Sequence, residues 1–351
     1  MASRLQHYWT EEERAYASML LRKGYTRREI ASAVTEKFGW PCTPRSVSGQ
    51  VLDQAKVGKD LFLDAEKTIE LAELDQINRR VDLDKPLMPA TINLDLSEVK
   101  LPVGIAWFSD IHLGHENCNY KKLDEVLNLV SKTPGLLSFL GGDSVCNFII
   151  PKLAHAAQKC NIKVEDQYIK LYDWLLDKAS KADSALGINK LLGSGYGNHE
   201  YWTKRLAYLD LHSYITKASG HRTSGIRTFI NINVGGNEYL IYRAHRHRGF
   251  SSLNSSNNFR WLYNDAPKPF DVGVLEDKHH SVGGWWPQHG ESRYFIRPGS
   301  FIPADDYALE LGFFGGSIRV PVTVFHPKNR HITVFEYTED AVCFLEGFYG
   351  K

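Results

Sequence analysis

From Val103 onward, the sequence places short polar motifs directly after apolar, strand-like runs. The run VGIAWF is followed by Asp110 and His112, and the run LLSFL is followed by two glycines and Asp143. Open α/β sheets collect their ligand sites at the carboxyl ends of their strands. The chain is therefore expected to fold so that these polar side chains meet at one edge.

Three later motifs extend this pattern. The turn GSGYGNHE closes the run INKLL, His245 closes EYLIYRA, and Asp277 and His279 follow DVGVLE. The turn itself contributes an amide, an imidazole and a carboxylate: Asn198, His199 and Glu200. In an extended Asp-x-His, both side chains project to the same side, so two ligands can reach one ion. This set of nitrogen and oxygen donors suits Mn²⁺, Fe or Zn²⁺.

The order of elements predicts the fold class. Helical stretches near Tyr120–Ser131 and Val164–Ala182 separate the early strand-like runs, and the later runs follow one another directly. Early alternation with helices followed by consecutive strands predicts an α/β sandwich with mixed sheets. We assign residues 101–351 to this domain.

The first 60 residues have a different pattern, that of three short helices. Thr10 and Thr26 each begin a capping box with a glutamate three residues later, and Thr43 precedes Pro44 at the start of a third segment. This pattern resembles a helix-turn-helix or Myb-like DNA-binding module. The third segment presents polar residues suited to phosphates or base edges: Arg45, Ser48, Gln50 and Gln54. A trihelical cap or an oligomerisation domain remains the alternative.

Residues 61–100 are interpreted as a connector between these two domains. An acidic helix comes first, and the proline spacing of KPLMPATINLDL then indicates an extended linker.

Composition excludes some classes of protein. The net charge is +1, so it gives no general argument for nucleic-acid binding. No apolar run approaches the roughly 18 residues of a membrane span, and the start of the chain lacks the apolar core of a signal peptide. The five cysteines are scattered, without the pairing of a metal site. We expect no membrane partner and a reducing, cytoplasmic compartment.

Taken together, the motifs DxH, GD, GNHE, a lone histidine and a final DKH resemble those of the calcineurin-like metallophosphoesterases. The resemblance covers about residues 103–345, and the stretch RYFIRPGSFIPADDYALELGF is similar to phage and bacterial members. It implies a two-sheet αββα sandwich that binds two divalent metal ions. Mn²⁺ is the expected metal, with Fe, Zn²⁺ or Ni²⁺ as alternatives.

The resemblance also implies roles for individual residues. The first ion would be held by one aspartate and two histidines: Asp110, His112 and His279. Asp143 would bridge the ions, and the second ion would be held by three further residues: Asn198, His245 and Asp277. His199 would donate a proton or a hydrogen bond to the leaving oxygen, and Glu200 would orient His199.

The last motif departs from the family pattern. The family has Gly-His-x-His where this chain has Glu276-Asp277-Lys278-His279, so an aspartate stands where the first histidine belongs. An alternative register uses Lys278 and His280 and leaves the second ion short of a ligand. An inactive relative, weakened by this change, is a further alternative.

The resemblance implies hydrolysis of a phosphate ester by a water activated between two ions about 3.5–4 Å apart. The stretch GGDSVCNFIIP lacks the arginine with which phosphatase members clamp a monoester, which favours a diester. Residues 250–286 and their surroundings interleave aromatic residues with arginines, which suits nucleic acid: Phe259, Trp261, Tyr263, Trp285, Trp286, Arg243, Arg246, Arg248 and Arg260. We therefore expect a DNA-directed nuclease or phosphodiesterase. A phosphomonoesterase, a DNA-binding protein without activity and a merely packed aromatic cluster are the alternatives.

Overall fold

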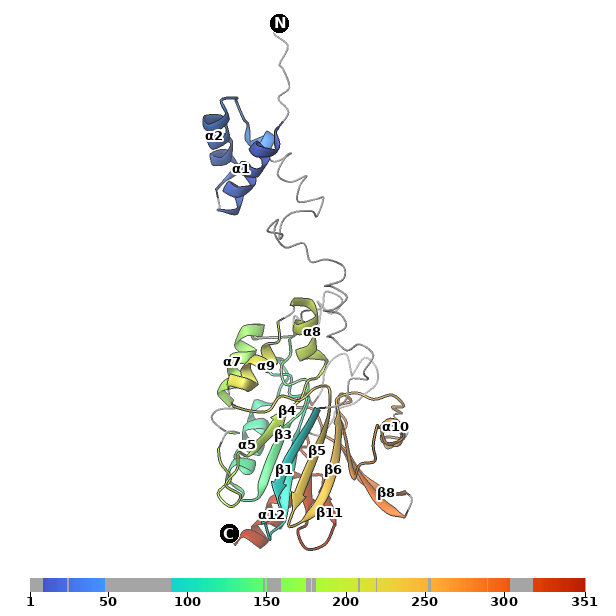
Figure 1. Cartoon of the computed structure of the whole chain (residues 1–351). Helices are drawn as coiled ribbons and strands as arrows, with labels where there is room; N and C mark the ends of the chain where they lie inside the picture. Colours follow the sequence, from blue (N-terminus) through green and yellow to red (C-terminus); the bar gives the residue numbers. More distant parts are fainter. Residues whose placement is uncertain are drawn as a thin grey trace. The chain divides into compact units, whose positions relative to one another are not determined.

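The computed structural model describes the following residues: 9–23, 25–47, 90–147, 149, 159–174, 178, 181–207, 209–218, 220–251, 254–288, 290–303 and 318–350. The chain divides into two compact units, Met1–Pro86 and Leu87–Lys351 (Figure 1). Among the described residues, no helix combines the length and apolar character that crossing a membrane requires.

The first unit contains helices α1 (Glu11–Arg22) and α2 (Arg27–Phe38). Both begin at the predicted capping boxes, in which Thr10 and Thr26 each accept a hydrogen bond from the backbone of a glutamate and the glutamate side chain bonds back. Residues 44–47 are helical, and the rest of the predicted third helix lies outside the described residues. The two predicted helices are therefore confirmed.

A small apolar core holds this unit together. Trp9 and Trp40 meet edge to face with ring centroids 5.4 Å apart, and the Trp40 indole donates a hydrogen bond of 2.6 Å to buried Glu13. The remaining buried apolar residues come from both helices and the third segment: Ala17, Leu20, Ile30, Ala31, Val34 and Val47.

The second unit contains two sheets. The six-stranded sheet has the order β1-β5-β6-β7-β9-β8, with these bounds: β1 Ala90–Leu96, β5 Arg227–Val234, β6 Asn237–Ala244, β7 Val272–Leu275, β9 Glu291–Arg297 and β8 Val282–Gln288. The five-stranded sheet has the order β11-β10-β2-β3-β4, with these bounds: β11 Ile332–Phe335, β10 Val322–Phe325, β2 Val103–Phe108, β3 Leu136–Leu140 and β4 Leu191–Ser194.

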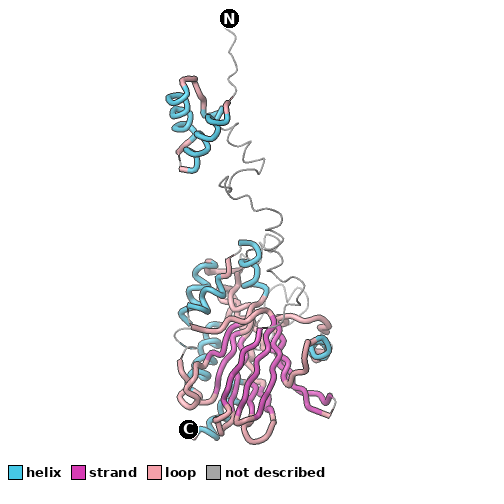
Figure 2. The backbone as a smooth tube through the Cα atoms, viewed as in Figure 1, coloured by secondary structure: helices cyan, strands magenta, loops and turns pink. Residues whose placement is uncertain are grey.

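Most helices of this unit lie on the side of the five-stranded sheet, and α10 lies beside the six-stranded sheet (Figure 2). Their bounds are α5 Tyr120–Lys132, α7 Val164–Trp174, α8 Asn198–Ala207, α9 Leu211–Ala218, α10 Asn257–Asp265 and α12 Thr338–Tyr349. Helices α5 and α12 contact the five-stranded sheet, and α10 contacts β7 of the other sheet. The arrangement is the expected αββα sandwich.

Strand β2 shows how the layers are built. Ile105 and Trp107 face the core between the two sheets, whereas Ala106 and Phe108 face the core beneath the helices. A strand buried on both faces reads as a continuous apolar run, which is why VGIAWF was recognisable in the sequence. The Trp107 indole N–H donates a hydrogen bond of 3.0 Å to the Thr323 hydroxyl, so its polar atom is satisfied inside the core.

The end of the predicted linker folds differently from our expectation. Residues 90–96 form β1, which pairs in parallel with β5 from Ala90 opposite Thr228 to Leu96 opposite Val234. Ile92 and Leu96 are buried in the inter-sheet core. The alternation of apolar residues is that of a half-buried strand, and the preceding prolines obscured it. The acidic helix predicted before it lies outside the described residues.

Two cysteines form a disulfide, although the expected reducing compartment gave no reason to predict one. A disulfide joins Cys146, just after the motif of Asp143, to Cys160. Among the described residues, Cys42, Cys118 and Cys343 are free.

Candidate metal centre

The predicted site residues stand just past the carboxyl ends of five strands. They come after β2, β3 and β4 of one sheet and β6 and β7 of the other. β2, β3 and β4 are mutually parallel, and so are β6 and β7. Parallel strands end at the same edge of a sheet, so residues that are far apart in the sequence meet there.

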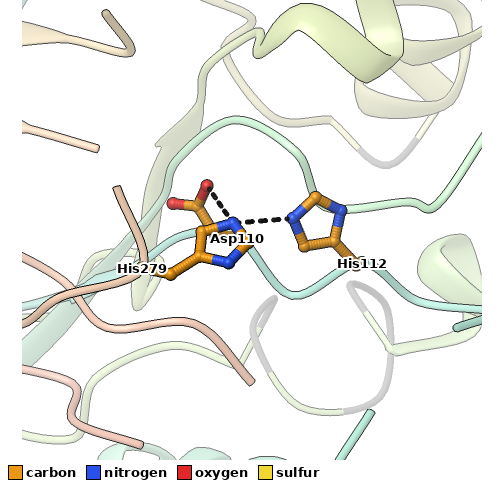
Figure 3. Close-up of side chains that lie close together, drawn as sticks. All are labelled: Asp110, His112 and His279. Carbon is orange, nitrogen blue, oxygen red and sulfur yellow. Dashed lines mark hydrogen bonds and ion pairs between the residues drawn. The ribbon is translucent and has the colours of Figure 1, made fainter. Parts of the chain in front are cut away.

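One group of donor atoms, the outer subsite, consists of Asp110, His112 and His279 (Figure 3). The Nε2 atoms of His112 and His279 lie 3.2 Å apart, and His279 Nε2 lies 3.4 Å from Asp110 Oδ1. Asp110 Oδ1 is buried and has no hydrogen-bond partner among the described residues. Two imidazole nitrogens and one carboxylate oxygen therefore face one another.

A second group, the inner subsite, consists of Asp143, Asn198 and His245. The His245 Nε2 atom lies 3.1 Å from Asn198 Oδ1 and 3.3 Å from Asp143 Oδ2. Donor atoms of Asp110, Asp143 and His245 also lie within 4.8 Å of one another, so the two subsites adjoin. The shared carboxylates and the mixed nitrogen and oxygen donors fit a pair of divalent ions.

Backbone strain marks the same residues. Six non-glycine residues among those described have positive φ, and five of them are predicted metal ligands: Asp110 at 50°, His112 at 50°, Asp143 at 56°, Asp277 at 72° and His279 at 55°. Such conformations cost energy and persist where surrounding structure imposes them, often at functional sites. The sixth residue, Asn147, follows the motif of Asp143.

The structure brings His279, and not His280, beside Asp110 and His112. His280 is exposed, so the geometry follows the register of Asp277 with His279. Asp277 Oδ1 lies 3.8 Å from His245 Nε2, at the border of the inner subsite.

The ring of His199 lies beside His112 of the outer subsite and Asp143 of the inner subsite. Its Nδ1 is hydrogen-bonded to the carbonyl oxygen of Cys146, and its Nε2 lies 3.7 Å from Asp143 Oδ2. The ring lies 4.7 Å from that of His112 between centroids. A donor atom of His199 also groups with those of His112 and Asp143, so the geometry allows it to be a ligand as well as a proton donor.

The carboxylate of Glu200, which we expected to orient His199, contacts the backbone of two loops. Glu200 accepts backbone hydrogen bonds from Asp143 at 2.9 Å, Ser144 at 2.6 Å and Gly197 at 2.8 Å. It therefore holds the loop of Asp143 against the loop of Asn198. The Glu200 carboxylate accepts hydrogen bonds from backbone N–H groups, and the His199 ring is hydrogen-bonded to the Cys146 carbonyl.

A buried ion pair beneath the inner subsite was not predicted from the sequence. Glu276 accepts hydrogen bonds from Arg243 Nε at 2.7 Å and from Gly142 N at 2.9 Å, and Arg243 Nη2 makes a further short contact. The same carboxylate lies 2.9 Å from His245 Nδ1. We call Arg243 and Glu276 the brace. Our expectation that Arg243 contacts nucleic acid is wrong, because its side chain is fully buried.

Glycines make room for the brace. A Cβ atom on Gly141 would lie 2.5 Å from Glu276 Oε1, and one on Gly195 would lie 2.3 Å from Arg243 Nη1. Both glycines belong to the polar motifs that the sequence displays. They allow the motif loops to approach the buried charges closely. In the sequence, Glu276 stands where the family resemblance expects a glycine, but nothing there indicates its pairing with Arg243.

The pKa values of His112 and His245 are shifted in opposite directions. Burial, followed by the neighbouring His199, lowers the pKa of His112 well below its ordinary value. Burial also acts to lower the pKa of His245, but Asp143 and the hydrogen bonds to Asp143 and Glu276 outweigh it and raise that pKa well above normal. Burial acts to raise the pKa of Glu276, yet Arg243 and His245 bring it down to about 2. Glu276 is therefore an anion beneath the site.

The aromatic and arginine-rich segment is packed only in part. Phe259 is buried in the core beneath α10, with Tyr263 and Trp286 against it, whereas Trp261 and Trp285 are exposed. Arg248 makes two hydrogen bonds of 2.8 Å to Asp265. The alternative of a packed cluster therefore describes Arg243 and three of the five aromatic residues, while the other members of the set are exposed.

The predicted DNA contacts can be followed only in part. Arg45 lies in the helical residues 44–47 and is exposed. The other three lie outside the described residues: Ser48, Gln50 and Gln54.

No protein-family model matches the sequence, and no curated protein matches it either. Similar solved structures include Vps29 of Entamoeba histolytica in complex with Zn²⁺, at 9% identity and a TM-score of 0.29, covering 66% of this chain and 97% of that one. A conserved predicted phosphoesterase of Streptococcus pneumoniae has 13% identity and a TM-score of 0.29, covering 67% and 97%. Vps29 of Chaetomium thermophilum has 11% identity and a TM-score of 0.29, covering 66% and 94%. At these values, function has to be argued from the site itself.

Proposed function

We propose that this protein is a phosphoesterase that uses two divalent metal ions. The observation that carries the proposal is the convergence of carboxylate, imidazole and amide donors from five strand ends on two adjoining subsites. Bound ions would neutralise phosphate oxygens and lower the pKa of an attacking water. Mn²⁺ is the metal we propose to test first, because the donors are of hard-to-borderline type.

The protein's own residues divide the work as follows. Asp143 Oδ2 lies 3.3 Å from His245 Nε2, and carboxylate oxygens of Asp143 also group with donor atoms of Asp110 and of His112, so Asp143 is proposed to join the two subsites. His199, anchored by the Cys146 carbonyl at Nδ1, would present Nε2 to the leaving oxygen. A general acid at that position contributes typically 10²–10⁴-fold to the rate.

For the substrate, we propose a phosphodiester of DNA, with the N-terminal unit as the DNA-binding part. Two capped helices and the exposed Arg45 at the start of the third segment support this proposal. A phosphate at the N-terminus of that segment would also gain from the helix dipole.

A phosphomonoester is the second candidate, and a specific observation favours it. Arg246 and Lys278 both reach the carboxylate of Asp277 at the border of the inner subsite. They supply cations that the sequence did not place at the site, so the missing arginine after Asp143 no longer argues against a dianionic substrate.

The deciding experiment compares substrates under one condition. The full-length protein, loaded with Mn²⁺, is offered p-nitrophenyl phosphate, bis(p-nitrophenyl) phosphate, and single- and double-stranded DNA. Hydrolysis of the diester and of DNA supports the first candidate, and hydrolysis confined to the monoester supports the second. If the protein binds two ions and hydrolyses none of the four, the proposal of a phosphoesterase is wrong.

A further inference from the structure

Asp277 stands where the family resemblance expects a histidine, and its surroundings change with it. Arg246 Nε is hydrogen-bonded to Asp277 Oδ1, and Lys278 Nζ lies 2.8 Å from Oδ2. Relative to a neutral imidazole, the aspartate adds one negative charge, and the two cations more than offset it. Arg246 and Lys278 thus place two positive charges beside the single carboxylate of Asp277.

Arg246 has unused hydrogen-bonding capacity. The Asp277 side chain is 4% exposed, whereas that of Arg246 is 59% exposed, so the guanidinium lies on the solvent side of the centre. An arginine carries five N–H donors in a fixed planar fork. Among the described residues, Arg246 uses only its Nε donor, which is hydrogen-bonded to Asp277. Its two terminal amino groups have no protein acceptor there.

Asp277 connects Arg246 to the metal centre. Asp277 Oδ1, which holds Arg246, is also 3.8 Å from His245 Nε2, and the Asp277 backbone N–H donates a hydrogen bond of 3.2 Å to Asp110 Oδ2. Asp277 thus contacts both subsites and fixes the near end of the guanidinium. A planar fork anchored at one end is suited to bidentate recognition of a phosphate.

We propose that Arg246 binds the non-bridging oxygens of the phosphate ester, with Asp277 orienting its guanidinium and Lys278 adding a second cation. This inference rests on the proposed phosphoesterase function and adds a specificity-determining residue to it. It also gives Asp277 a role of its own, because its carboxylate positions a substrate-binding arginine at the border of the inner subsite.

Arg248 supplies a matched control two residues along the same loop. Its side chain is 64% exposed, close to that of Arg246. It differs in that Nε and Nη2 both bond Asp265 and that the guanidinium lies 4.5 Å from the centre of the Trp261 ring. Arg248 is therefore occupied by the protein, so its loss removes the same charge without removing a free fork.

The test measures the binding of inorganic phosphate to the Mn²⁺-loaded, full-length protein by calorimetry, with metal content determined in parallel. Arg246→Gln should raise the Kd for phosphate roughly tenfold to a hundredfold, the value of a hydrogen bond to a charged group. The KM values for the monoester and the diester should rise with it. Arg248→Gln should leave all three values and the metal content unchanged, and Arg246→Lys should recover part of the affinity.

Unchanged phosphate affinity in Arg246→Gln would overturn the inference even if the wild-type protein hydrolyses esters. Loss of metal in Arg246→Gln would overturn it as well, because the arginine would then only hold Asp277 in place. The proposed function fails separately, through the absence of hydrolysis in the wild-type protein.

Discussion

The two subsites use similar donors but differ in what stands behind them. In the inner subsite, His245 is 1% exposed, and its Nδ1 is hydrogen-bonded to Glu276, which Arg243 and Gly142 hold in turn. In the outer subsite, the side chain of His279 is 33% exposed, and buried His112 Nδ1 has no hydrogen-bond partner among the described residues. The His245 ring is therefore fixed by a carboxylate behind it, whereas the His112 ring has no such partner among the described residues.

This difference predicts which of the two metal ions binds more tightly. A metal-binding histidine whose second nitrogen bonds a carboxylate has a fixed ring orientation, and the loss of such a partner typically costs 10–100-fold in metal affinity. We therefore expect the inner subsite to fill first as Mn²⁺ is added. The four substitutions below test this order, from the largest expected loss of metal to the smallest.

Asp143→Asn should have the largest effect, because the Asp143 carboxylate contacts both subsites. An amide cannot neutralise two cations, so we expect both ions to be lost and hydrolysis to be abolished. Elemental analysis measures the ions. Asp124→Asn, which alters a surface partner of Lys178, should keep both. A variant at Asp143 that retains two ions would show that this residue does not join the subsites.

His279→Ala should remove one ion, that of the outer subsite, and leave the inner one bound. The Nε2 atom of His279 is one of three donors there, at 3.2 Å from that of His112. His280→Ala provides the control at the next position, where the side chain is exposed. Manganese EPR distinguishes a coupled pair from a single ion. Loss of metal from the His280 variant alone would reverse the register.

Glu276→Gln should keep two sites but weaken the inner one 10–100-fold, which would bring its affinity down towards that of the outer subsite. It also leaves the Arg243 charge buried without its counter-ion, which typically costs about 3–5 kcal/mol of stability. Glu336→Gln alters a glutamate that pairs with Arg319 at the surface, where about 0–1 kcal/mol is expected. Metal titration and thermal unfolding of both variants measure the difference. Equal effects would mean that the brace does not support His245.

His199→Ala should leave the metal content unchanged and slow hydrolysis by roughly 10²–10⁴-fold. The loss should be smaller for substrates with a good leaving group such as nitrophenol, because a proton donor matters less there. Rates on nitrophenyl and alkyl esters make the comparison. If an ion is lost instead, His199 is a ligand beside His112 and Asp143, and the outer subsite has more support than we infer.

The sequence predicted the strand ends well because they combine two strong signals. Runs such as VGIAWF are buried on both faces and are therefore apolar throughout, and the polar residues after them stand out. The capped helices α1 and α2 were found through the side-chain chemistry of their first turns. These features are local, so a single sequence contains them.

Pairings between distant segments were not predictable in the same way. Arg243 and Glu276 are separated by 33 residues, and an arginine in a strand gives no sign of the carboxylate it meets. The carboxylate of Glu200 was assigned to the neighbouring His199, but it bonds a loop 55–57 residues earlier in the chain. Strand β1 was interpreted as part of an extended linker because prolines precede it, and its pairing with the distant β5 was not predicted.

The close fit of Gly141 and Gly195 around the brace has a consequence for how this protein can evolve. Alanine at either glycine collides with a charged group in the present background, since its Cβ would fall 2.5 Å from Glu276 Oε1 or 2.3 Å from Arg243 Nη1. Once Arg243 has been replaced by a smaller side chain, the contacts that hinder alanine at Gly195 are gone, whereas at Gly141 the backbone oxygen of Phe108 still lies 2.8 Å from the Cβ position. The order of mutational steps therefore matters at Gly195: Arg243 has to change before this glycine does, so the ancestry of the loop after β4 is tied to that of a residue on β6.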